Sequence, residues 1–243
     1  MTTAARPPAD LQLNQLLAAL APAQRERWLP HLEPVEMEQG QVLCEAGCTP
    51  PWVIFPTTAI VSLSYLTQDG ASAEYAVVGN DGVVGIAVFM GGNATPGRAV
   101  VQCAGQGLRL SARVLKETVG QSGPVLALLL RYTQALIVQM AQTAACNRHH
   151  AIDQQLCRRL LMGLDRSLSN ELAMTQEALA NLLGVRREGI TAAAIGLQRA
   201  GVIRYRRGHI EVLDRPRLER RSCECYAVAH REYRRLLPLP LAA

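Results

Sequence analysis

Two groups of polar side chains near the C-terminal end of the chain could read a nucleic acid. One begins with the run Arg186–Glu188, two arginines followed by a glutamate, and continues one turn later with Thr191. The other is the pair Arg206–Arg207. Arginine can pair with O6 and N7 of guanine, and glutamate can accept a hydrogen bond from the cytosine amine, so the first group has the chemistry of base recognition. Arginines at the tip of a loop are better placed for phosphate.

These side chains need a scaffold, and the pattern from Met174 to Ile203 predicts one. Thr175 is a good N-cap, and an apolar stripe follows it until Gly184, where a glycine can turn the chain sharply. A second helix follows from about Arg186 and stops at Gly201. Its apolar positions recur at helical spacing: Ile190, Ala193, Ala194 and Leu197. Two short helices that meet at a tight glycine turn predict a helix-turn-helix with a recognition helix.

A basic wing is predicted directly after these helices. The strand-like runs Val202–Tyr205 and Ile210–Leu213 enclose the turn Arg206–His209, which carries two cations. An ordinary helical hairpin and a surface β-hairpin would each show part of this pattern. The glycine turn, the arginine-led second helix and the basic wing occur together in the expected order, and the combination predicts DNA binding.

The same segment resembles the DNA-binding domain of the Crp/Fnr superfamily of bacterial transcription regulators. The matching residues are Thr175-Gln176-Glu177, Leu179-Ala180, Leu183-Gly184-Val185, Arg187-Glu188 and Gly201-Val202-Ile203. The chain departs from the family at two positions. Arg186 stands where the family usually has a serine or threonine cap, and Ala192 stands where it often has a second arginine. Since a base contact is lost at Ala192, the operator need not match the family consensus.

Nine residues are expected to contact DNA. They are Thr175, Gln176, Arg186, Arg187, Glu188, Thr191, Arg199, Arg206 and Arg207. Arg187 and Glu188, assisted by Thr191, should read base edges in a half-site core that contains G·C pairs. Arg199 and the two wing arginines should contact phosphate, because a helix end and a wing tip lie over the backbone.

The distribution of charge also separates the C-terminal part of the 243-residue chain from the rest. The formal net charge is +5, and 49% of the residues are hydrophobic, which suits a globular protein with a substantial core. Residues 184–237 contain 13 arginines and 6 acidic residues, whereas the rest of the chain has 12 basic and 14 acidic residues. A basic end on a neutral body is typical of a nucleic-acid-binding domain joined to a sensing domain.

The chain starts without an apolar signal core, and we find no later run of about 18 apolar residues, so a cytoplasmic protein is expected. Its seven cysteines are odd in number and scattered: Cys44, Cys48, Cys103, Cys146, Cys157, Cys223 and Cys225. In a reducing compartment such a set predicts free thiols.

A β-rich region is predicted from Val35 to about Lys116, after an amphipathic helical stretch from Leu11 to about Leu32. Its strand-like runs are Trp52–Phe55, Ile60–Leu66, Glu74–Val78, Val83–Val88 and Ala99–Gln102. Short runs separated by Gly, Pro, Asn or Asp turns predict a sandwich or jelly roll.

The family resemblance extends into this region. Gly40–Leu43, with Gly47, resembles the opening of a cyclic-nucleotide-binding β-roll, and two further segments resemble its phosphate-binding cassette. The ligand-binding residues that this resemblance implies are Gly82, Gly85, Arg98 and Ala99. The cassette of the family also has a glutamate for the ribose hydroxyl, and Ile86 or a neighbour takes its place here, so cyclic AMP is not the expected effector. Arg98 could bind another anion or be a solvated loop arginine.

From Pro124 the apolar residues recur at helical spacing and form a narrow stripe, or seam, along one face of the predicted helix. Such a seam predicts pairing with a second copy in a homodimer, as in the family. The residues expected to pair with a second copy are Leu126, Leu129, Thr133, Leu136, Ile137 and Met140, with Gln134, Gln139 and Gln142 outside the seam. Part of this helix must also pack on its own β-roll. The run Cys146–His150 interrupts the apolar pattern and predicts a hinge, and Pro216–Leu237 predicts a C-terminal helix.

The predicted fold class is α+β, with an N-terminal β-roll (a jelly roll like that of cyclic-nucleotide-binding domains), a long dimerisation helix and a C-terminal winged helix-turn-helix. The expected segments are 1–30 (helical), 31–122 (sensor β-roll), 123–147 (dimerisation helix and hinge), 148–220 (winged helix-turn-helix) and 221–243 (C-terminal helix and tail). The expected function is a ligand-responsive transcription regulator that binds a palindromic operator in double-stranded DNA and acts with RNA polymerase.

The sequence offers little support for an enzymatic function. A cupin-type metal site needs two or three histidines inside the barrel, and only His31 precedes His149. We find no Ser-His-Asp arrangement, phosphate loop or paired-cysteine zinc ribbon, and we predict no catalytic residue and no metal site. Two alternatives stay open: a redox, haem or iron–sulfur sensor that uses the cysteines, and a ligand-binding adaptor that does not bind DNA. Buried inert thiols compete with the first, since free cysteine packs as a small hydrophobe, and the local basic charge argues against the second.

Overall fold

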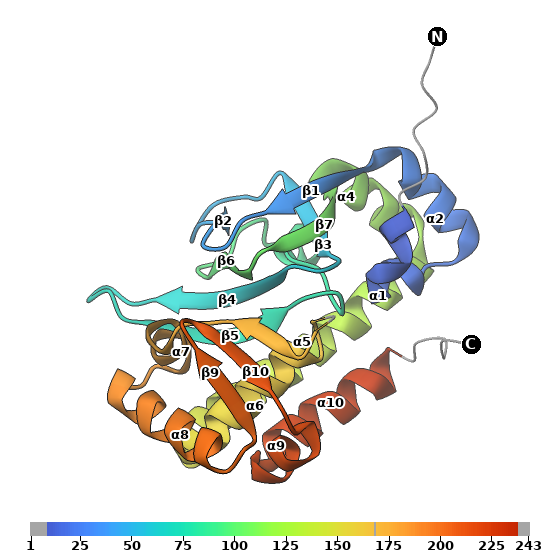
Figure 1. The fold of residues 1–243 in the computed structure, drawn as a ribbon. Helices are drawn as coiled ribbons and strands as arrows, with labels where there is room; N and C mark the ends of the chain where they lie inside the picture. The colour runs from blue at the N-terminus through green and yellow to red at the C-terminus, as the bar shows by residue number, and fades with distance from the viewer. Residues whose placement is uncertain (1–8, 168, 238–243) are drawn as a thin grey trace.

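A computed structural model describes residues 9–167 and 169–237 as a β-roll, a long helix, and a smaller unit that folds back against the roll (Figure 1). The predicted N-terminal helical stretch is divided into η1 (Ala9–Leu13), α1 (Gln15–Ala18), α2 (Pro22–Trp28) and η2 (Leu29–His31). Pro22 begins α2, because proline is tolerated where a helix has no partner for its first amide. The outer parts of the predicted segments 1–30 and 221–243 lie outside the described residues.

Two antiparallel sheets form the roll, with strand orders β2-β6-β4-β5 and β1-β7-β3. The strands are β1 (Leu32–Met37), β2 (Val42–Cys44), β3 (Trp52–Pro56), β4 (Ile60–Leu66), β5 (Ser72–Val78), β6 (Arg98–Cys103) and β7 (Gly105–Ser111). Alternate side chains such as Val53 and Phe55 are buried, as expected for strands with one face in the core. The predicted β-roll is confirmed.

One predicted strand, Val83–Val88, is wrong. Val84 makes a single bridge to Ile54, and the chain then forms the short helix α3 (Ala87–Met90). Gly85 lies between them at φ +102°, a conformation that side-chain-bearing residues rarely adopt, and it ends the extended run. A short apolar run does not distinguish a buried strand from a buried helical turn.

Two helices follow the roll, α4 (Ala112–Gln121) and the 27-residue α5 (Gly123–His149). Much of α5 packs on its own roll, and Leu129 and Leu136 are each only 2% exposed. Gln139, expected to lie outside the seam, is buried instead. Its side-chain amide pairs with the backbone of Val77, with Oε1 2.7 Å from the Val77 nitrogen and Nε2 3.3 Å from its oxygen. A buried glutamine is stable here because strand β5 offers it both a donor and an acceptor.

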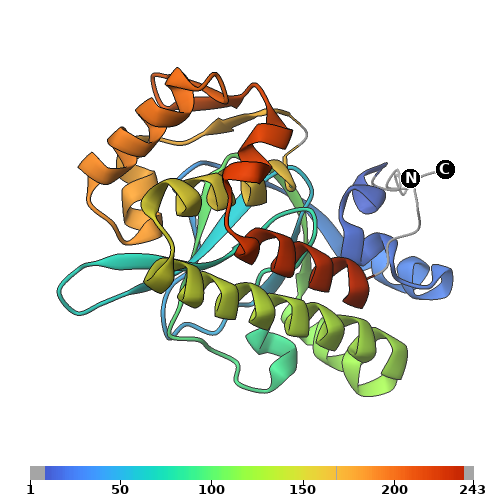
Figure 2. The ribbon, with the colours of Figure 1, turned by 90° about the horizontal axis from the view of Figure 1, so that it is seen from below.

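By length and mean composition alone, α5 is one helix that could cross a membrane. An 18-residue window has a mean hydropathy of 1.3, and 44% of that window is buried inside the structure. One face of α5 lies on the roll, and the C-terminal helix runs alongside it (Figure 2). Packing within the protein therefore accounts for the apolar residues on the buried face of this helix.

The unit after α5 contains both predicted helices and the predicted wing. Its elements are α6 (Ile152–Leu164), β8 (Glu171–Ala173), α7 (Gln176–Leu183), α8 (Arg187–Arg199), β9 (Ile203–Arg206), β10 (His209–Val212), α9 (Arg215–Arg221) and α10 (Glu224–Leu236). Strand β8 was not predicted; it pairs with β10 to complete a sheet of order β8-β10-β9. The single predicted C-terminal helix is two helices, because the chain is extended at Ser222 and Cys223.

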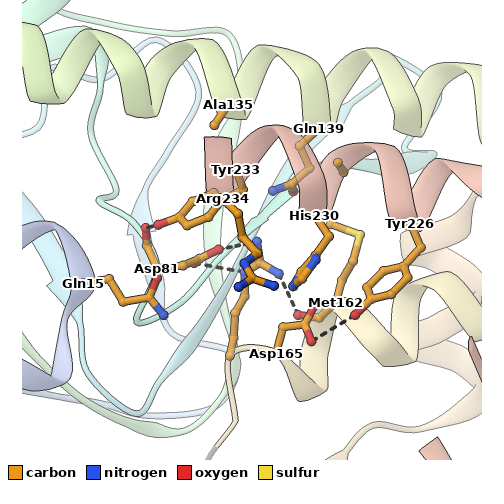
Figure 3. Close-up of a pocket in the computed structure, with 12 residues that line it drawn as sticks. Gln15, Asp81, Ala135, Gln139, Met162, Asp165, Tyr226, His230, Tyr233 and Arg234 are labelled. Atoms are coloured by element: carbon orange, nitrogen blue, oxygen red, sulfur yellow. Dashed lines mark hydrogen bonds and ion pairs between the residues drawn. The ribbon is translucent and has the colours of Figure 1, made fainter. Parts of the chain in front are cut away.

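Buried arginines of α6 and of the turn after it join this unit to the roll. Nη2 of Arg159 donates to Glu74 and to Gln102, each at 3.1 Å, and its Nε forms an ion pair with Glu74 at 2.6 Å that lacks hydrogen-bond geometry. Arg166 pairs with Asp81 at 2.5 Å, and the hydroxyl of Tyr233 from α10 donates to the Asp81 carbonyl oxygen (Figure 3). The roll and the C-terminal unit therefore share a polar interface.

Candidate nucleic-acid interface and effector cavity

The turn between α7 and α8 has the geometry expected of a helix-turn-helix. The hydroxyl of Thr175 accepts from the Ala178 amide at 3.0 Å, which confirms this N-cap. Gly184 ends α7 at φ +64°, and its conformation lets the chain reverse without a Cβ clash. Arg186 is the N-cap of α8 and makes no side-chain capping hydrogen bond, as the departure from the family pattern at this position implied.

The start of α8 is polar and solvent-exposed, while its opposite face is buried. Ile190, Ala194 and Leu197 pack in the core of the C-terminal unit. Arg187 and Glu188 are exposed at the N-terminal end of the helix. The residues that could reach base edges are therefore held on a helix whose other face is fixed by packing.

An open groove lies between the starts of α7 and α8 and the wing. It is lined by Thr175, Gln176, Glu177, Arg187, Tyr205, Arg207 and Gly208. The hydroxyl of Thr191 is 2.7 Å from Oε1 of Gln176 and links the two helices across this groove. Arg187 and Glu177 approach only to 3.9 Å, and both side chains are more than 60% exposed, so this ion pair holds Arg187 weakly.

The wing turn carries two exposed arginines. Arg207 and Gly208 have φ values of +45° and +85°, the pattern of a type I′ hairpin turn. Among the described residues, no ion-pair partner is within 4.0 Å of Arg206, Arg207 or Arg199, the last of which is exposed at the end of α8. Arg204, by contrast, pairs with Glu211 on the neighbouring strand at 2.6 Å. The unpaired arginines keep their charge available to an anion.

The comparison with family models identifies this unit. Residues 154–221 match the model described as the Crp-like helix-turn-helix domain. This part of the chain therefore resembles a Crp-like helix-turn-helix domain and is called the Crp-like domain below. A comparison with curated protein sequences finds no match.

Several solved structures resemble this chain over a much larger part of its length than the Crp-like domain. FixK2 from Bradyrhizobium japonicum is 16% identical with a TM-score of 0.66, covering 79% of this chain and 98% of its own. TTHB099, a CRP-family transcriptional regulator from Thermus thermophilus, is 18% identical with a TM-score of 0.64, covering 77% and 96%. The regulator CLP of Xanthomonas campestris, described as responsive to c-di-GMP, is 15% identical with a TM-score of 0.62, covering 80% and 100%. At these identities the likeness concerns the fold, and the chain has the fold of Crp/Fnr regulators.

The β-roll contains a cavity of about 360 Å³ that reaches α5. Gly85, Arg98 and Ala99 line it, and so do Leu136 and Met140 of α5. Most of the remaining lining residues are apolar or aromatic: Pro50, Leu63, Tyr65, Tyr75, Val84, Ile86, Ala87 and Pro96. No carboxylate is among the lining residues in the described part of the chain. The groups that meet in this cavity suit a largely apolar molecule.

Two of the predicted ligand residues do not match the expected cassette. Gly82 does not line the cavity; a Cβ there would come within 2.3 Å of the Tyr132 hydroxyl, so this glycine is needed for close packing against α5. Arg98 pairs with Glu45 at 3.1 Å, with 36% of its side chain exposed. Its charge is thus already offset by a carboxylate, although its Nε has no hydrogen-bond partner in the described part of the chain.

The six residues predicted for the dimer seam differ in how far their own chain buries them. Leu129, Thr133 and Leu136 are covered by the same chain, and Leu126 and Met140 are half-buried. Ile137 is 52% exposed. The outward face of α5 also carries Leu130, Gln134, Ala141 and Ala144, at heptad spacing with Ile137.

The structure also assembles a group that the sequence analysis treated as scattered. Cys223 and Cys225, which are distant in sequence from Cys146, lie with it beside His150. A hydrogen bond from Cys146 lowers the pKa of the Cys223 thiol. Burial instead raises the pKa of Cys157, to about 12. The available signals were the spacing i, i+4 of Cys146 and His150 and the Cys-x-Cys pair, but sequence spacing alone does not bring the two together.

Proposed function

We propose that this protein is a DNA-binding transcription regulator of the Crp/Fnr type, which acts as a homodimer with RNA polymerase and responds to an effector other than cyclic AMP. The observation that carries the proposal is the exposed arginine surface at the start of α8 and on the wing of a domain that matches the Crp-like helix-turn-helix model, where Arg187 is only weakly paired and the wing arginines have no ion-pair partner among the described residues. Exposed arginines on an element of this shape supply the phosphate attraction and base contacts that operator binding needs.

Selection of bound duplexes from a random-sequence library tests the DNA-binding activity. A dimer should select two inverted half-sites about 34 Å apart, one helical turn of DNA. Fluorescence anisotropy on the selected duplex should show affinity that falls as salt rises. Arg113→Ala serves as a charge control, since Arg113 is 82% exposed on α4. Absent binding, or binding insensitive to salt, would favour the adaptor hypothesis.

The proposed dimer contact is the outward face of α5, defined by Leu130, Gln134, Ile137, Ala141 and Ala144. Replacing Ile137 by Asp would place a charge in an apolar interface, at a cost of several kcal/mol unless the charge reaches water. We expect the variant to sediment as a monomer and to bind a palindromic operator poorly. Leu213→Asp is the matched control, because Leu213 is 44% exposed and lies outside α5. An undisturbed Ile137→Asp dimer would contradict this contact.

Effector binding is assigned to the roll cavity, which is lined by side chains from α5 as well as from the sheets. Without a carboxylate for the ribose hydroxyls and with Arg98 paired to Glu45, cyclic AMP should bind no tighter than about 1 mM, a free energy near −4 kcal/mol. Isothermal titration calorimetry on the full chain checks this, and micromolar binding would contradict it. Mass spectrometry of denatured, freshly purified protein should identify any small molecule that co-purifies.

A further inference from the structure

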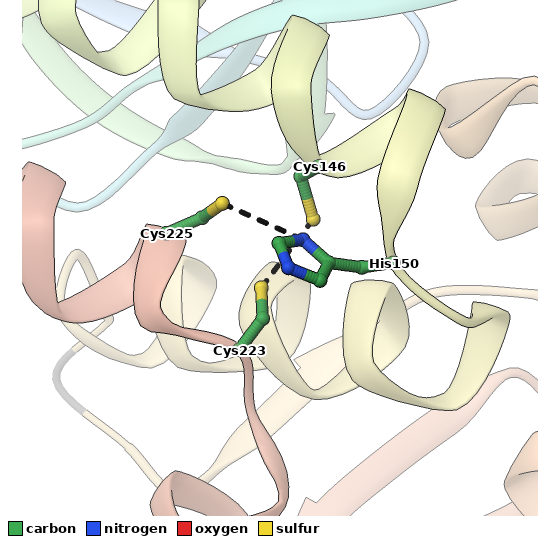
Figure 4. Close-up of side chains that lie close together, drawn as sticks. All are labelled: Cys146, His150, Cys223 and Cys225. Atoms are coloured by element: carbon green, nitrogen blue, oxygen red, sulfur yellow. Dashed lines mark hydrogen bonds between the residues drawn. The ribbon is translucent and has the colours of Figure 1, made fainter.

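Four potential metal ligands converge beside the end of α5, and none of them is among the residues that line the DNA-facing groove or the effector cavity. Cys146 lies in the last turn of α5, and His150 follows this helix directly. Cys223 is the N-cap of α10, and Cys225 lies in its first turn. The three sulfurs and a ring nitrogen all lie within 4.8 Å of one another and point toward a common centre (Figure 4).

Two of the separations between these atoms match those around one tetrahedral ion. The sulfurs of Cys146 and Cys223 are 3.5 Å apart, and the sulfur of Cys225 is 3.6 Å from Nδ1 of His150. Zinc bonds of about 2.3 Å to sulfur and about 2.0 Å to nitrogen place two tetrahedral sulfurs about 3.8 Å apart and a sulfur and a nitrogen about 3.5 Å apart. A cluster of several irons would hold its thiolates farther apart, because the metal atoms and bridging sulfides lie between them.

Burial argues against interpreting these thiols as inert packing. Cys146, Cys223 and Cys225 are 0%, 5% and 2% exposed, yet they form a small cluster of their own and belong to neither large hydrophobic core. Cys157, in contrast, packs among the leucines of the C-terminal core. Cysteines that fill space as small hydrophobes are expected to resemble Cys157, with apolar neighbours.

The histidine has the second partner that a metal ligand requires. Nε2 of His150 lies 3.3 Å from Oε1 of Glu224, while Nδ1 faces the sulfurs. A carboxylate on the far nitrogen fixes the tautomer that leaves the near nitrogen free to bind metal. Because Glu224 lies between Cys223 and Cys225 in sequence, the same short segment supplies two ligands and the group that orients a third.

Charge balance is provided by a buried arginine. Three thiolates and a neutral imidazole around a divalent ion leave one net negative charge. Arg158 is 2% exposed and close enough to the three cysteines to interact with them electrostatically, and its Nη2 donates to the Thr143 hydroxyl at 2.7 Å. Its Nε has no partner among the described residues. A buried guanidinium beside a negatively charged centre needs no further counterion.

We infer that Cys146, His150, Cys223 and Cys225 bind one zinc ion in a closed, structural Cys₃His site. The ion joins the end of α5 to the start of α10, and α6 of the Crp-like domain begins at Ile152, two residues after the histidine ligand. The site therefore fixes the angle at which the Crp-like domain leaves α5. This regulatory role, unlike the metal site itself, rests on the proposed function.

Metal analysis of the full chain, purified without a histidine tag, tests the site. Inductively coupled plasma mass spectrometry should give one zinc per chain, and titration with a mercurial reagent should release it. Reconstitution with Co²⁺ should give the visible bands of a tetrahedral thiolate complex. Chain without metal, a Cys146–Cys223 disulfide in anaerobically prepared protein, or iron with acid-labile sulfide would each overturn the inference.

Variants separate the four ligands from the other cysteines. Cys223→Ser and His150→Ala should lower the zinc content well below one per chain, whereas Cys48→Ser, at an exposed cysteine, and Cys157→Ala, at a buried one, should retain it. Should a ligand variant fail to fold, Glu224→Gln still tests the site, because loss of such an outer carboxylate typically weakens metal binding 10- to 100-fold. Unchanged chelator competition in Glu224→Gln together with unchanged zinc in Cys223→Ser would refute the site.

The regulatory role has a separate readout. Removing zinc should change the affinity for the selected duplex, and restoring zinc should reverse that change. If the wild-type chain binds DNA with the same affinity with and without zinc, the metal site is retained and its proposed regulatory role is refuted. If the chain binds zinc but no DNA under any condition, the proposed function fails and the metal site again stands.

Discussion

The arginines of α6 and those of α8 and the wing belong to the same Crp-like domain but lie in opposite environments. Arg158 and Arg159 are 2% and 1% exposed, and Arg159 contacts a carboxylate of the β-roll. Arg187 and Arg206 are exposed, and within residues 9–167 and 169–237 no acidic group lies closer to Arg187 than Glu177 at 3.9 Å and none forms an ion pair with Arg206. The comparison shows that a basic domain presents only some of its charge to DNA, and that the rest can hold the domain against its neighbour.

The cost of desolvation explains why the two groups need different partners. A buried guanidinium is stable only when anionic or hydrogen-bond-accepting groups replace water, and Glu74 with Gln102 supplies them to Arg159. An exposed guanidinium keeps its water until a phosphate or a base releases it. Removal of charge should therefore affect folding in the first group and DNA binding in the second.

The largest effect is expected from Glu74→Ala, which leaves Arg159 buried without its counter-charge. Breaking a buried pair by removing one partner costs about 3–5 kcal/mol of unfolding free energy. Glu211→Ala, which breaks the exposed pair with Arg204, should cost about 1 kcal/mol or less. Urea unfolding of both variants and the wild type measures the difference. Equal losses would show that the α6 arginines do not join the domain to the roll.

Local sequence patterns predicted the helices and turns that carry the exposed arginines, whereas the partners of the buried arginines could not be predicted, for a physical reason. Thr175, Gly184 and the wing turn act within a few residues, so capping and turn preferences reveal them in the sequence. Arg159 and Glu74 are 85 residues apart, and Cys146 and Cys223 are 77 apart. Only the folded chain brings such partners together.

The spacing of apolar residues was also an ambiguous guide, because the partner that covers an apolar face can lie far away in the sequence. It placed α5 correctly, but it could not tell which side faces the roll, so Leu129 and Leu136 were assigned to a dimer seam although their own chain covers them. The same limit applies to Gln139, whose backbone partners on β5 lie 62 residues away. Val83–Val88 was taken for a strand because a short apolar run satisfies either structure.

Arg187→Ala should have the next largest effect and should act on sequence preference. Loss of an arginine that pairs with guanine costs about 1–3 kcal/mol of binding free energy and relaxes the preference at one base pair. Competition binding across single-base variants of the selected duplex measures both quantities, with Arg113→Ala as the charge control. If Arg187→Ala lowered the affinity for every sequence equally, the recognition helix would be misplaced.

The smallest and most diagnostic effect is expected from Arg206→Ala. Arg206 is exposed where β9 meets the wing turn, and a cation there should contact phosphate rather than a base edge. Each phosphate contact adds about 0.9 to the slope of log affinity against log salt, so the variant should flatten that slope by about one unit. Its affinity should fall alike for all duplexes, and its unfolding free energy should stay within about 0.5 kcal/mol of wild type, unlike that of Glu74→Ala. Anisotropy titrations at several salt concentrations measure the slope. An unchanged slope, or a loss of affinity confined to particular sequences, would show that Arg206 does not contact the phosphate backbone. The wing would then not belong to the arginine surface that binds DNA.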